Sequence, residues 1–218
     1  MRIKFQQSLD ELKEMLLHMA GLSEQAIQRA IDAYSGRDIE LCDLVVRSEP
    51  AINDLEREID RRAMALLATE QPMAIDLRFI LAVLRINKDV ERVGDQAVNI
   101  ARNTKDMAPF EIDMPVDIPK IAGLASTMVR RAMQSFIEGN ADEAETVLRL
   151  DNQVDELNHE AFERLSIMIQ QRPQLAQQAL SALLIARNIE RIGDHATNIA
   201  EDVIFWVQGA DVRHPVHC

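Results

Sequence analysis

The sequence contains the same eleven-residue motif twice, about 100 residues apart. Residues 91–101 read ERVGDQAVNIA and residues 190–200 read ERIGDHATNIA, with eight of the eleven positions identical. Helix-ending glycines recur at a similar offset, at Gly36 and Gly139. Because two unrelated halves would have to agree by chance, the motif predicts a duplicated unit of roughly 100 residues.

Each unit is predicted to consist of three long helices. Apolar residues from Phe5 to Ala30 recur in steps of three and four, which is the period of one helix face. The chain is 47% apolar but only 4% aromatic, and its 218 residues include seven glycines and seven prolines, so an aliphatic core with few turns is expected. An all-α fold follows, with helices ending near 36, 70, 106, 138, 171 and 208.

Prolines predict the helix starts and one irregularity. Pro72 and Pro173 suit the first turn of the third and sixth helices, where a missing N–H costs no hydrogen bond. Pro50 falls inside the second helix, which we expect to start near Asp38, and predicts a kink or break one turn earlier.

These elements predict two tandem antiparallel three-helix bundles, which could lie end to end or side by side. The N-terminal bundle is expected over 1–107 and the C-terminal bundle over 117–209. A proline-containing linker at 108–116 separates the bundles, and an irregular tail covers 210–218.

Charge and cysteine usage exclude several kinds of protein. Asp and Glu number 36 against 24 Lys and Arg, and the net charge of −12 disfavours binding to nucleic acid or directly to an anionic bilayer. Cys42 and Cys218 are expected to be free thiols, since they lie far apart without a metal-binding or redox spacing. With neither a signal-like N-terminus nor an apolar run of about 20 residues, a cytoplasmic protein is predicted.

Polar residues of the repeated motif lie on one helix face. In the first repeat Glu91, Asp95 and Asn99 follow at steps of four, which spans about 80° of a helix. The second repeat places Glu190, Asp194 and Asn198 in the same way. Like charges at this spacing repel each other, so the motif predicts a compensating cation.

The middle helix of each unit carries acids at the same spacing: Glu56 with Asp60, and Asp151 with Asp155. An antiparallel neighbour could bring four carboxylates together in each bundle. Carboxylates without His or Cys suit hard cations such as Mg²⁺, Mn²⁺, Ca²⁺ or oxidised iron.

Two alternatives to a metal remain open. Arg92 and Arg191, or arginines on neighbouring helices, could supply the positive charge. The acid pairs could also form solvated helix faces crossed by ion pairs, since Arg57 and Arg61 alternate with the acids of the second helix.

The chain resembles the PhoU family of phosphate-transport regulators along nearly its whole length. The two eleven-residue motifs are similar to the twin signatures of that family, as are QPMAIDLR at 71–78, EDVIF at 201–205 and GADVRH at 209–214. The chain departs from the family at Pro50 and in its short tail. The resemblance implies two three-helix bundles with pseudo-twofold symmetry.

The resemblance also implies that these acidic motifs bind metal ions or multinuclear clusters, with Mg, Mn, Fe and Zn as candidate metals. Carried onto this chain, the implied ligands are Glu91, Asp95, Glu190 and Asp194, supported by the two middle-helix pairs. Asn99, Asn198 and Asp202 lie along the same faces and are expected to complete the coordination.

The family role implied is regulatory and not enzymatic. Such proteins are thought to couple a phosphate ABC transporter, through its ATPase subunit, to a sensor histidine kinase. They hold the phosphate-starvation response off and restrain uptake. A homodimer, peripheral to the membrane at most, is expected. Two further hypotheses are a carboxylate-bridged metal store or redox enzyme, and a structural adaptor that binds no metal.

Overall fold

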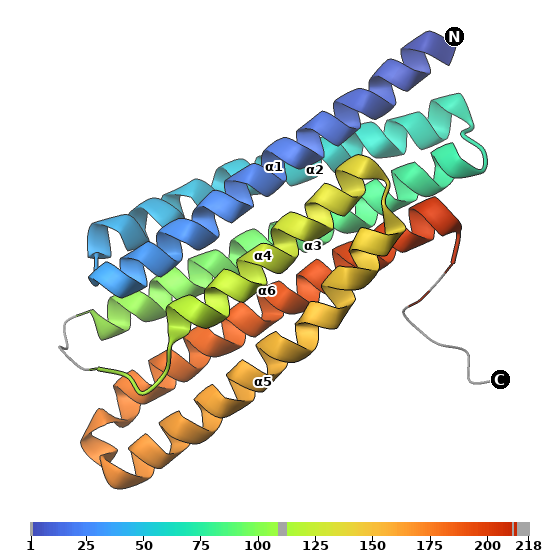
Figure 1. Cartoon of the computed structure of the whole chain (residues 1–218). Coiled ribbons are helices and arrows are strands. Elements are labelled where there is room, and N and C mark those ends of the chain that lie inside the picture. Colours follow the sequence, from blue (N-terminus) through green and yellow to red (C-terminus); the bar gives the residue numbers. More distant parts are fainter. Residues whose placement is uncertain (1, 109–112, 211, 213–218) are drawn as a thin grey trace.

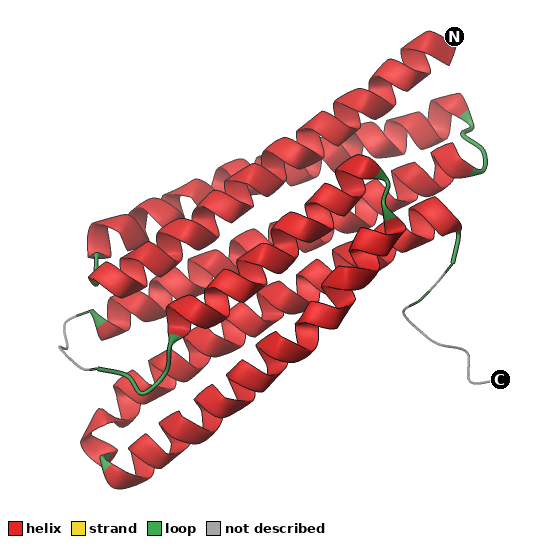
Figure 2. Cartoon of the chain, in the orientation of Figure 1, coloured by secondary structure: helices red, strands yellow, loops and turns green. Residues whose placement is uncertain are grey.

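The computed structural model describes residues 2–108, 113–210 and 212, and its described part is all-helical. Six long helices account for most of the described chain (Figure 1 and Figure 2). The helices are α1 (Arg2–Gly36), α2 (Ile39–Glu70), α3 (Ile75–Met107), α4 (Ile118–Glu138), α5 (Ala141–Gln171) and α6 (Ala176–Gln208), with a 3-10 turn, η1, at Pro173–Leu175.

The two repeats form three-helix bundles that lie side by side (Figure 1). Helices α1, α2 and α3 pack against one another, and α4, α5 and α6 do the same. The closest packing between the bundles joins α3 to α6, and α1 also contacts α4. In Figure 1, α1 and α2 therefore lie on one side of the molecule and α5 on the other, with α3, α4 and α6 between them.

The apolar stripe predicted for the first helix is the buried face of α1. Leu12, Leu16 and Met19 are fully buried against the other helices. Ser23 is the polar member of the stripe and is also buried, and its hydroxyl donates to the Val90 carbonyl of α3 at 3.1 Å. A polar side chain is tolerated there because its hydrogen bond replaces the one lost to water.

Capping residues explain where several helices begin and end. The Asp38 carboxylate accepts from the Leu41 N–H at the start of α2, and Asn140 caps α5 in the same way through the Glu143 N–H. Gly139 ends α4 with a φ of 63°, in the left-handed region that glycine adopts at low cost.

The prolines behave differently from the sequence-based prediction at two places. Helix α2 continues through Pro50 without a break, and Pro50 is exposed, so water can reach the backbone around the lost hydrogen bond. Pro72 does not open α3, which begins at Ile75 because Ala74 has a φ of 50° and interrupts the helical backbone. Pro173 starts a 3-10 turn, and α6 follows at Ala176.

The two bundles share one hydrophobic core. Its main cluster contains buried residues from all six helices. Phe79, Phe136 and Trp206 contribute an aromatic group from both repeats, with ring centroids 5.2 to 5.8 Å apart. The repeats are therefore halves of one packed unit.

The cysteines, the predicted linker and tail, and the lengths of the apolar segments can also be compared with the sequence-based expectations. Cys42 is a buried free thiol, whereas Cys218 and most of the predicted irregular tail lie outside the described residues. Part of the predicted linker, residues 109–112, also lies outside them. Among the described helices, none is long and apolar enough to cross a membrane.

Candidate functional site

The acids of the first repeat surround a lysine. Lys88 on α3 forms ion pairs with both acids of the α2 pair, Glu56 and Asp60. Its Nζ atom lies 3.4 Å from Asp60 Oδ2, and its hydrogen bond to Glu56 raises the pKa of Lys88. Asn87 adds hydrogen bonds from Nδ2 to the Glu56 carbonyl at 2.9 Å and to Asp60 Oδ1 at 3.0 Å. The α2 acid pair is thus neutralised from within the repeat.

The motif acids of α3 lie beside this cluster. Arg92 Nη1 is 3.3 Å from Asp95 Oδ2, and Arg92 Nε is 3.6 Å from Glu91 Oε2. Burial raises the pKa of Glu91, and the nearby carboxylates of Asp95 and Glu56 add to the rise, while Arg92 opposes it. The predicted arginine alternative is therefore realised in part, because Arg92 contacts both motif acids.

The second repeat brings its four predicted acids together between α5 and α6. Burial raises the pKa of Asp151 to about 6, and the Asp155 and Asp194 carboxylates add to the rise. Burial also raises the pKa of Asp194 and of Glu190, and Asp155 raises both further. Each of these three carboxylates is therefore partly buried and lies close to other carboxylates, which disfavours its charged form.

Among the described residues, this second cluster has fewer ion pairs than the first. Arg187 occupies the position equivalent to Lys88, but its Nη1 atom bonds Glu190 Oε1, on its own helix, at 2.8 Å. Among the described residues, Asp151 and Asp155 form no ion pair, and Glu190 Oε2 is buried without a hydrogen-bond partner. Arg187 and Arg191 act on Glu190 and Asp194 from their own helix, but Asp151 and Asp155 lack the ion-paired cation that Lys88 gives the equivalent acids of the first repeat.

Asn198 and Asp202 connect the two repeats. Asn198 Nδ2 donates to Asp89 Oδ1 on α3 at 3.0 Å, and His195 Nδ1 donates to the same oxygen at 2.8 Å. Asp202 is buried and accepts from Arg85 Nη1 at 3.1 Å. The sequence-based prediction followed the spacing within each helix and so missed the partners on the other repeat.

Asn99, the equivalent of Asn198 in the first repeat, is half-buried on α3, and its backbone carbonyl accepts from Asn103 Nδ2 at 2.8 Å. The structure therefore brings together the eight predicted carboxylates as two groups of four. The remaining three predicted ligands are Asn99, Asn198 and Asp202. Asn99 bonds within its own helix, whereas Asn198 and Asp202 bond residues of the other repeat.

The two motif glycines face the middle helices. A Cβ atom on Gly94 would lie 2.9 Å from Ile52 Cδ1, so α2 and α3 approach closely there. A Cβ atom on Gly193 would lie 3.5 Å from Asp151 Oδ1, which is an ordinary contact. The close approach of α2 and α3 therefore accounts for a glycine at position 94. At position 193 a Cβ atom would fit, and the glycine leaves additional space beside the Asp151 carboxylate.

The donor chemistry of the second cluster fits a hard metal ion, since carboxylate oxygens suit Mg²⁺ and Mn²⁺ and one of them is buried and unpartnered. As the side chains stand, the described residues include no three His, Cys, Asp or Glu arranged around one metal position. Coordination by three protein oxygens would therefore require side-chain rotation.

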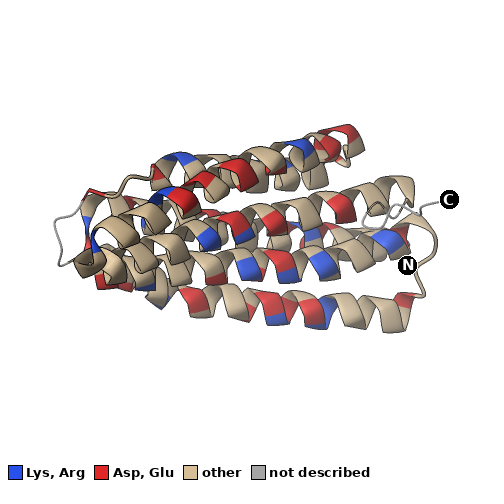
Figure 3. Cartoon of the chain, turned by 90° about the horizontal axis from the view of Figure 1, so that it is seen from below, with Lys and Arg blue, Asp and Glu red and all other residues tan. Residues whose placement is uncertain are grey.

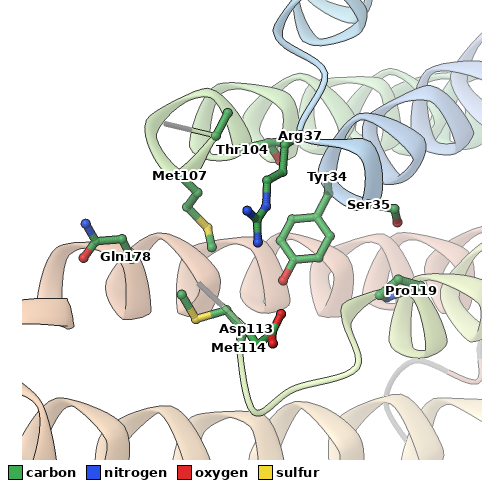
Figure 4. A pocket seen from close by; sticks show the side chains of 10 residues that line it. Tyr34, Ser35, Arg37, Thr104, Met107, Asp113, Met114, Pro119 and Gln178 are labelled. Atoms are coloured by element: carbon green, nitrogen blue, oxygen red, sulfur yellow. The ribbon is translucent and has the colours of Figure 1, made fainter. Parts of the chain in front are cut away.

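A separate pocket of about 290 Å³ lies where the repeats meet, near the ends of α1 and α3. Figure 4 shows the Arg37 guanidinium between the Met107 thioether and the Tyr34 ring. Thr104 Oγ1 and Gln178 Oε1 line this pocket and are buried without hydrogen-bond partners among the described residues. The pocket shares no lining residue with either acid cluster.

Charge is spread along the helices and is not confined to one end. Figure 3 shows acidic and basic positions interspersed on the same helices. On α2, for example, Glu58 bonds Arg61 and Arg62, and these bonds lower the pKa of Glu58 to about 2. The predicted ion-pair pattern of this helix is therefore present beside the acid cluster.

The fold defines an all-helical protein of two tandem three-helix repeats, each with an acidic motif on its last helix. The model of the PhoU domain matches the chain twice, at residues 16–104 and 118–203. The chain belongs to the PhoU family.

Relatives support this assignment over nearly the full length. A phosphate-specific transport system accessory protein PhoU homolog of Pseudomonas putida is 36% identical over 214 residues, which cover 97% of this chain and 83% of the relative. A homolog with the same description from Clostridium acetobutylicum is 30% identical, with coverage of 95% and 96%.

A solved structure gives the same fold. The crystal structure of PhoU from Pseudomonas aeruginosa matches with a TM-score of 0.91 and 33% identity, over 94% of this chain and 100% of that one. The predicted fold class, the internal repeat and the family resemblance are thereby confirmed.

Proposed function

We propose that this chain is an accessory regulator of phosphate uptake and holds the phosphate-starvation response off when phosphate is plentiful. The observation that carries the proposal is the match of both repeats to the PhoU domain, together with relatives described as accessory proteins of phosphate-specific transport systems. The role is non-catalytic: it consists of docking to other proteins.

In this proposal the chain couples the ATPase subunit of a phosphate ABC transporter to a sensor histidine kinase, at the cytoplasmic side of the membrane and as a homodimer. The net charge of −12 favours contact with proteins over direct contact with anionic lipid. Two rigid repeats with a shared core suit simultaneous contact with two partners, because their surfaces keep a fixed relative orientation.

A deletion strain tests the regulatory role. Cells lacking the gene, grown in abundant phosphate, should produce a starvation-induced enzyme such as alkaline phosphatase, and the wild-type gene should restore low activity. Low activity in the deletion strain would contradict the proposal unless a paralogue covers the role, which a double deletion would reveal.

We also propose that the acids of the second repeat bind a divalent cation, with Mg²⁺ or Mn²⁺ favoured by the oxygen donors. Asp151, Asp155, Glu190 and Asp194 would hold it. In the first repeat Lys88 already supplies the positive charge for Glu56 and Asp60, so Glu91 and Asp95 are the weaker site. A bound cation would relieve the repulsion among the carboxylates.

Calorimetric titration with Mn²⁺ tests the metal proposal. The double variant Asp151→Asn with Asp155→Asn should lose most of the binding, because two anionic ligands become neutral. Glu156→Gln is the matched control, since Glu156 is exposed on the same helix and outside the cluster. Equal Mn²⁺ binding by the wild type and the double variant would show that the ion binds elsewhere.

A further inference from the structure

An exposed apolar groove runs between α5 and α6, beside the acids of the second repeat. Its α5 side is a helical stripe of Asp155, Asn158, His159 and Phe162, and its α6 side is a stripe of Leu180, Leu183, Leu184 and Arg187, with Glu190 one turn further. The groove has a volume of about 800 Å³. We call it the α5–α6 groove.

The two ends of the groove differ in chemistry. Phe162, Leu180 and Leu184 lie at the end near the turn that joins the helices, and they are 58%, 52% and 53% exposed. Asp155 and Glu190 lie at the opposite end, further from that turn along both antiparallel helices. Large apolar side chains gathered at one exposed place mark an interaction surface.

The first repeat indicates what the acidic end lacks. There, the Lys88 ammonium sits between the two acids of the middle helix. The equivalent acids Asp151 and Asp155 form no ion pair among the described residues, because Arg187 turns to Glu190 instead. A lysine or arginine of another molecule would complete the same arrangement, in competition with the divalent cation proposed above for these acids.

We propose that the α5–α6 groove docks an amphipathic helix of a partner protein, with the apolar face of that helix on Phe162, Leu180 and Leu184 and a lysine or arginine at the acid pair Asp151 and Asp155. This deepens the proposed function and rests on it, since it assigns a docking surface to the regulator. The distance from Leu180 to Glu190 along α6 is about 15 Å, which matches roughly three turns of a helix.

Charge complementarity selects this occupant over a second copy of the chain. A second copy has a net charge of −12 and brings no excess of basic residues to the acidic end of the groove, whereas a helix with a basic end is attracted there. The contact of the proposed homodimer is therefore assigned to another face. The apolar end then supplies the burial that stabilises the complex.

Three synthetic amphipathic helices of about 18 residues probe the groove. The first carries a leucine stripe with lysines at one end, the second has glutamates in place of the lysines, and the third has serines in place of the leucines. Fluorescence anisotropy with the full chain, in buffer free of divalent metal, should give saturable binding for the first peptide only. The absence of saturable binding up to about 1 mM would overturn the proposal.

Variants of the chain locate the binding. Leu184→Ser should weaken binding of the first peptide at least tenfold, and Asp155→Asn should weaken it less and mainly at low salt. Met64→Ser and Glu156→Gln are the matched controls, because both residues are exposed and lie outside the groove. Equal binding by Leu184→Ser and the wild type would overturn the proposal.

Two other occupants give distinct results. If the acids serve a metal alone, Mn²⁺ binds and the peptide does not, which overturns the docking proposal. If a second copy occupies the groove, sedimentation shows that Leu184→Ser converts a dimer to a monomer, which also overturns it. Circular dichroism and thermal unfolding verify that each variant remains folded.

The deletion strain separates failure of the docking site from failure of the regulator. If the wild-type gene restores low alkaline phosphatase and Leu184→Ser does so equally, the groove proposal is wrong and the regulatory role stands. If the wild-type gene restores nothing, the regulatory role itself is wrong. Restoration by the wild type and by Met64→Ser, but not by Leu184→Ser, supports both.

Discussion

His195 Nδ1 lies 2.8 Å from Asp89 Oδ1, and this contact joins α6 of the second repeat to α3 of the first. Asn198 Nδ2 donates to the same oxygen at 3.0 Å, so one carboxylate collects two hydrogen bonds across the repeat interface. Gln96 occupies the position of His195 in the first repeat, and hence the contact is particular to one half of the duplication.

A double-mutant cycle measures how strongly these residues join the repeats. Asp89→Asn should lower the free energy of unfolding by about 1 kcal/mol, because the charged acceptor of two hydrogen bonds, one from the half-buried His195, is lost. His195→Gln should cost a similar amount. The double variant should lose less than the sum, with a coupling of about 0.5–2 kcal/mol by urea unfolding at neutral pH. Strict additivity would show that the two side chains do not interact in solution.

Asp151 predicts a pH dependence of stability. Its pKa in the folded protein is raised to about 6, so the folded state holds this proton more tightly than the unfolded chain does. The stabilising effect of protonation is complete below the unfolded pKa near 4 and is lost as the pH rises through about 6.

Asp151→Asn should therefore be more stable than the wild type at pH 7.5 and should show a flatter pH profile between pH 4 and 7. The gain should be on the order of 1 kcal/mol, because solvent screens a half-buried group. Urea unfolding across this range, with the exposed Asp142→Asn as control, provides the measurement. Parallel profiles for wild type and Asp151→Asn would rule out Asp151 as the titrating group.

The fold was predictable because local pattern and tertiary packing agree. The stripe through Leu12, Leu16 and Met19 became the buried face of α1, and the repeated motif placed the same acids on α3 and α6. The predictions at Pro50 and Pro72 were wrong for different reasons. Helix α2 continues through Pro50 because the exposed backbone there can be solvated, and α3 begins after Pro72 because the backbone turns at Ala74.

The sequence predicted which acids gather in each cluster, but it could not predict which basic side chains form ion pairs with them. The spacing predicted that Glu56, Asp60, Asp151 and Asp155 lie near the motif acids, because they fall at the same level along neighbouring antiparallel helices. Spacing could not show that Lys88 reaches across to α2 while Arg187 bonds its own helix, since side-chain direction depends on packing. The α5–α6 groove depends on the same kind of detail.

The two motif glycines should respond differently to alanine. Gly193→Ala should raise the free energy of unfolding by up to about 1 kcal/mol, because alanine favours helix and its Cβ atom makes only ordinary contacts. Gly94→Ala should gain less or lose stability, because its Cβ atom would force Ile52 to move. Thermal and urea unfolding of the pair test this order, and a more stable Gly94→Ala than Gly193→Ala would contradict it.

Replacing the internal cation should make the first repeat resemble the second. Lys88→Met leaves the buried Glu56 carboxylate and Asp60 without their ammonium partner, so the free energy of unfolding should fall by about 1 kcal/mol. Mn²⁺ should then stabilise this variant more than the wild type, because an ion that binds only the folded state shifts unfolding in proportion to its affinity.

Lys120→Met is the control for Lys88→Met, since Lys120 is exposed and lies outside both clusters. It should leave stability and the Mn²⁺ effect unchanged. Unfolding curves with and without Mn²⁺ give both quantities in one experiment. If Lys88→Met is as stable as the wild type and gains nothing from Mn²⁺, the α2 acids need no cation, and the comparison between the repeats loses its basis.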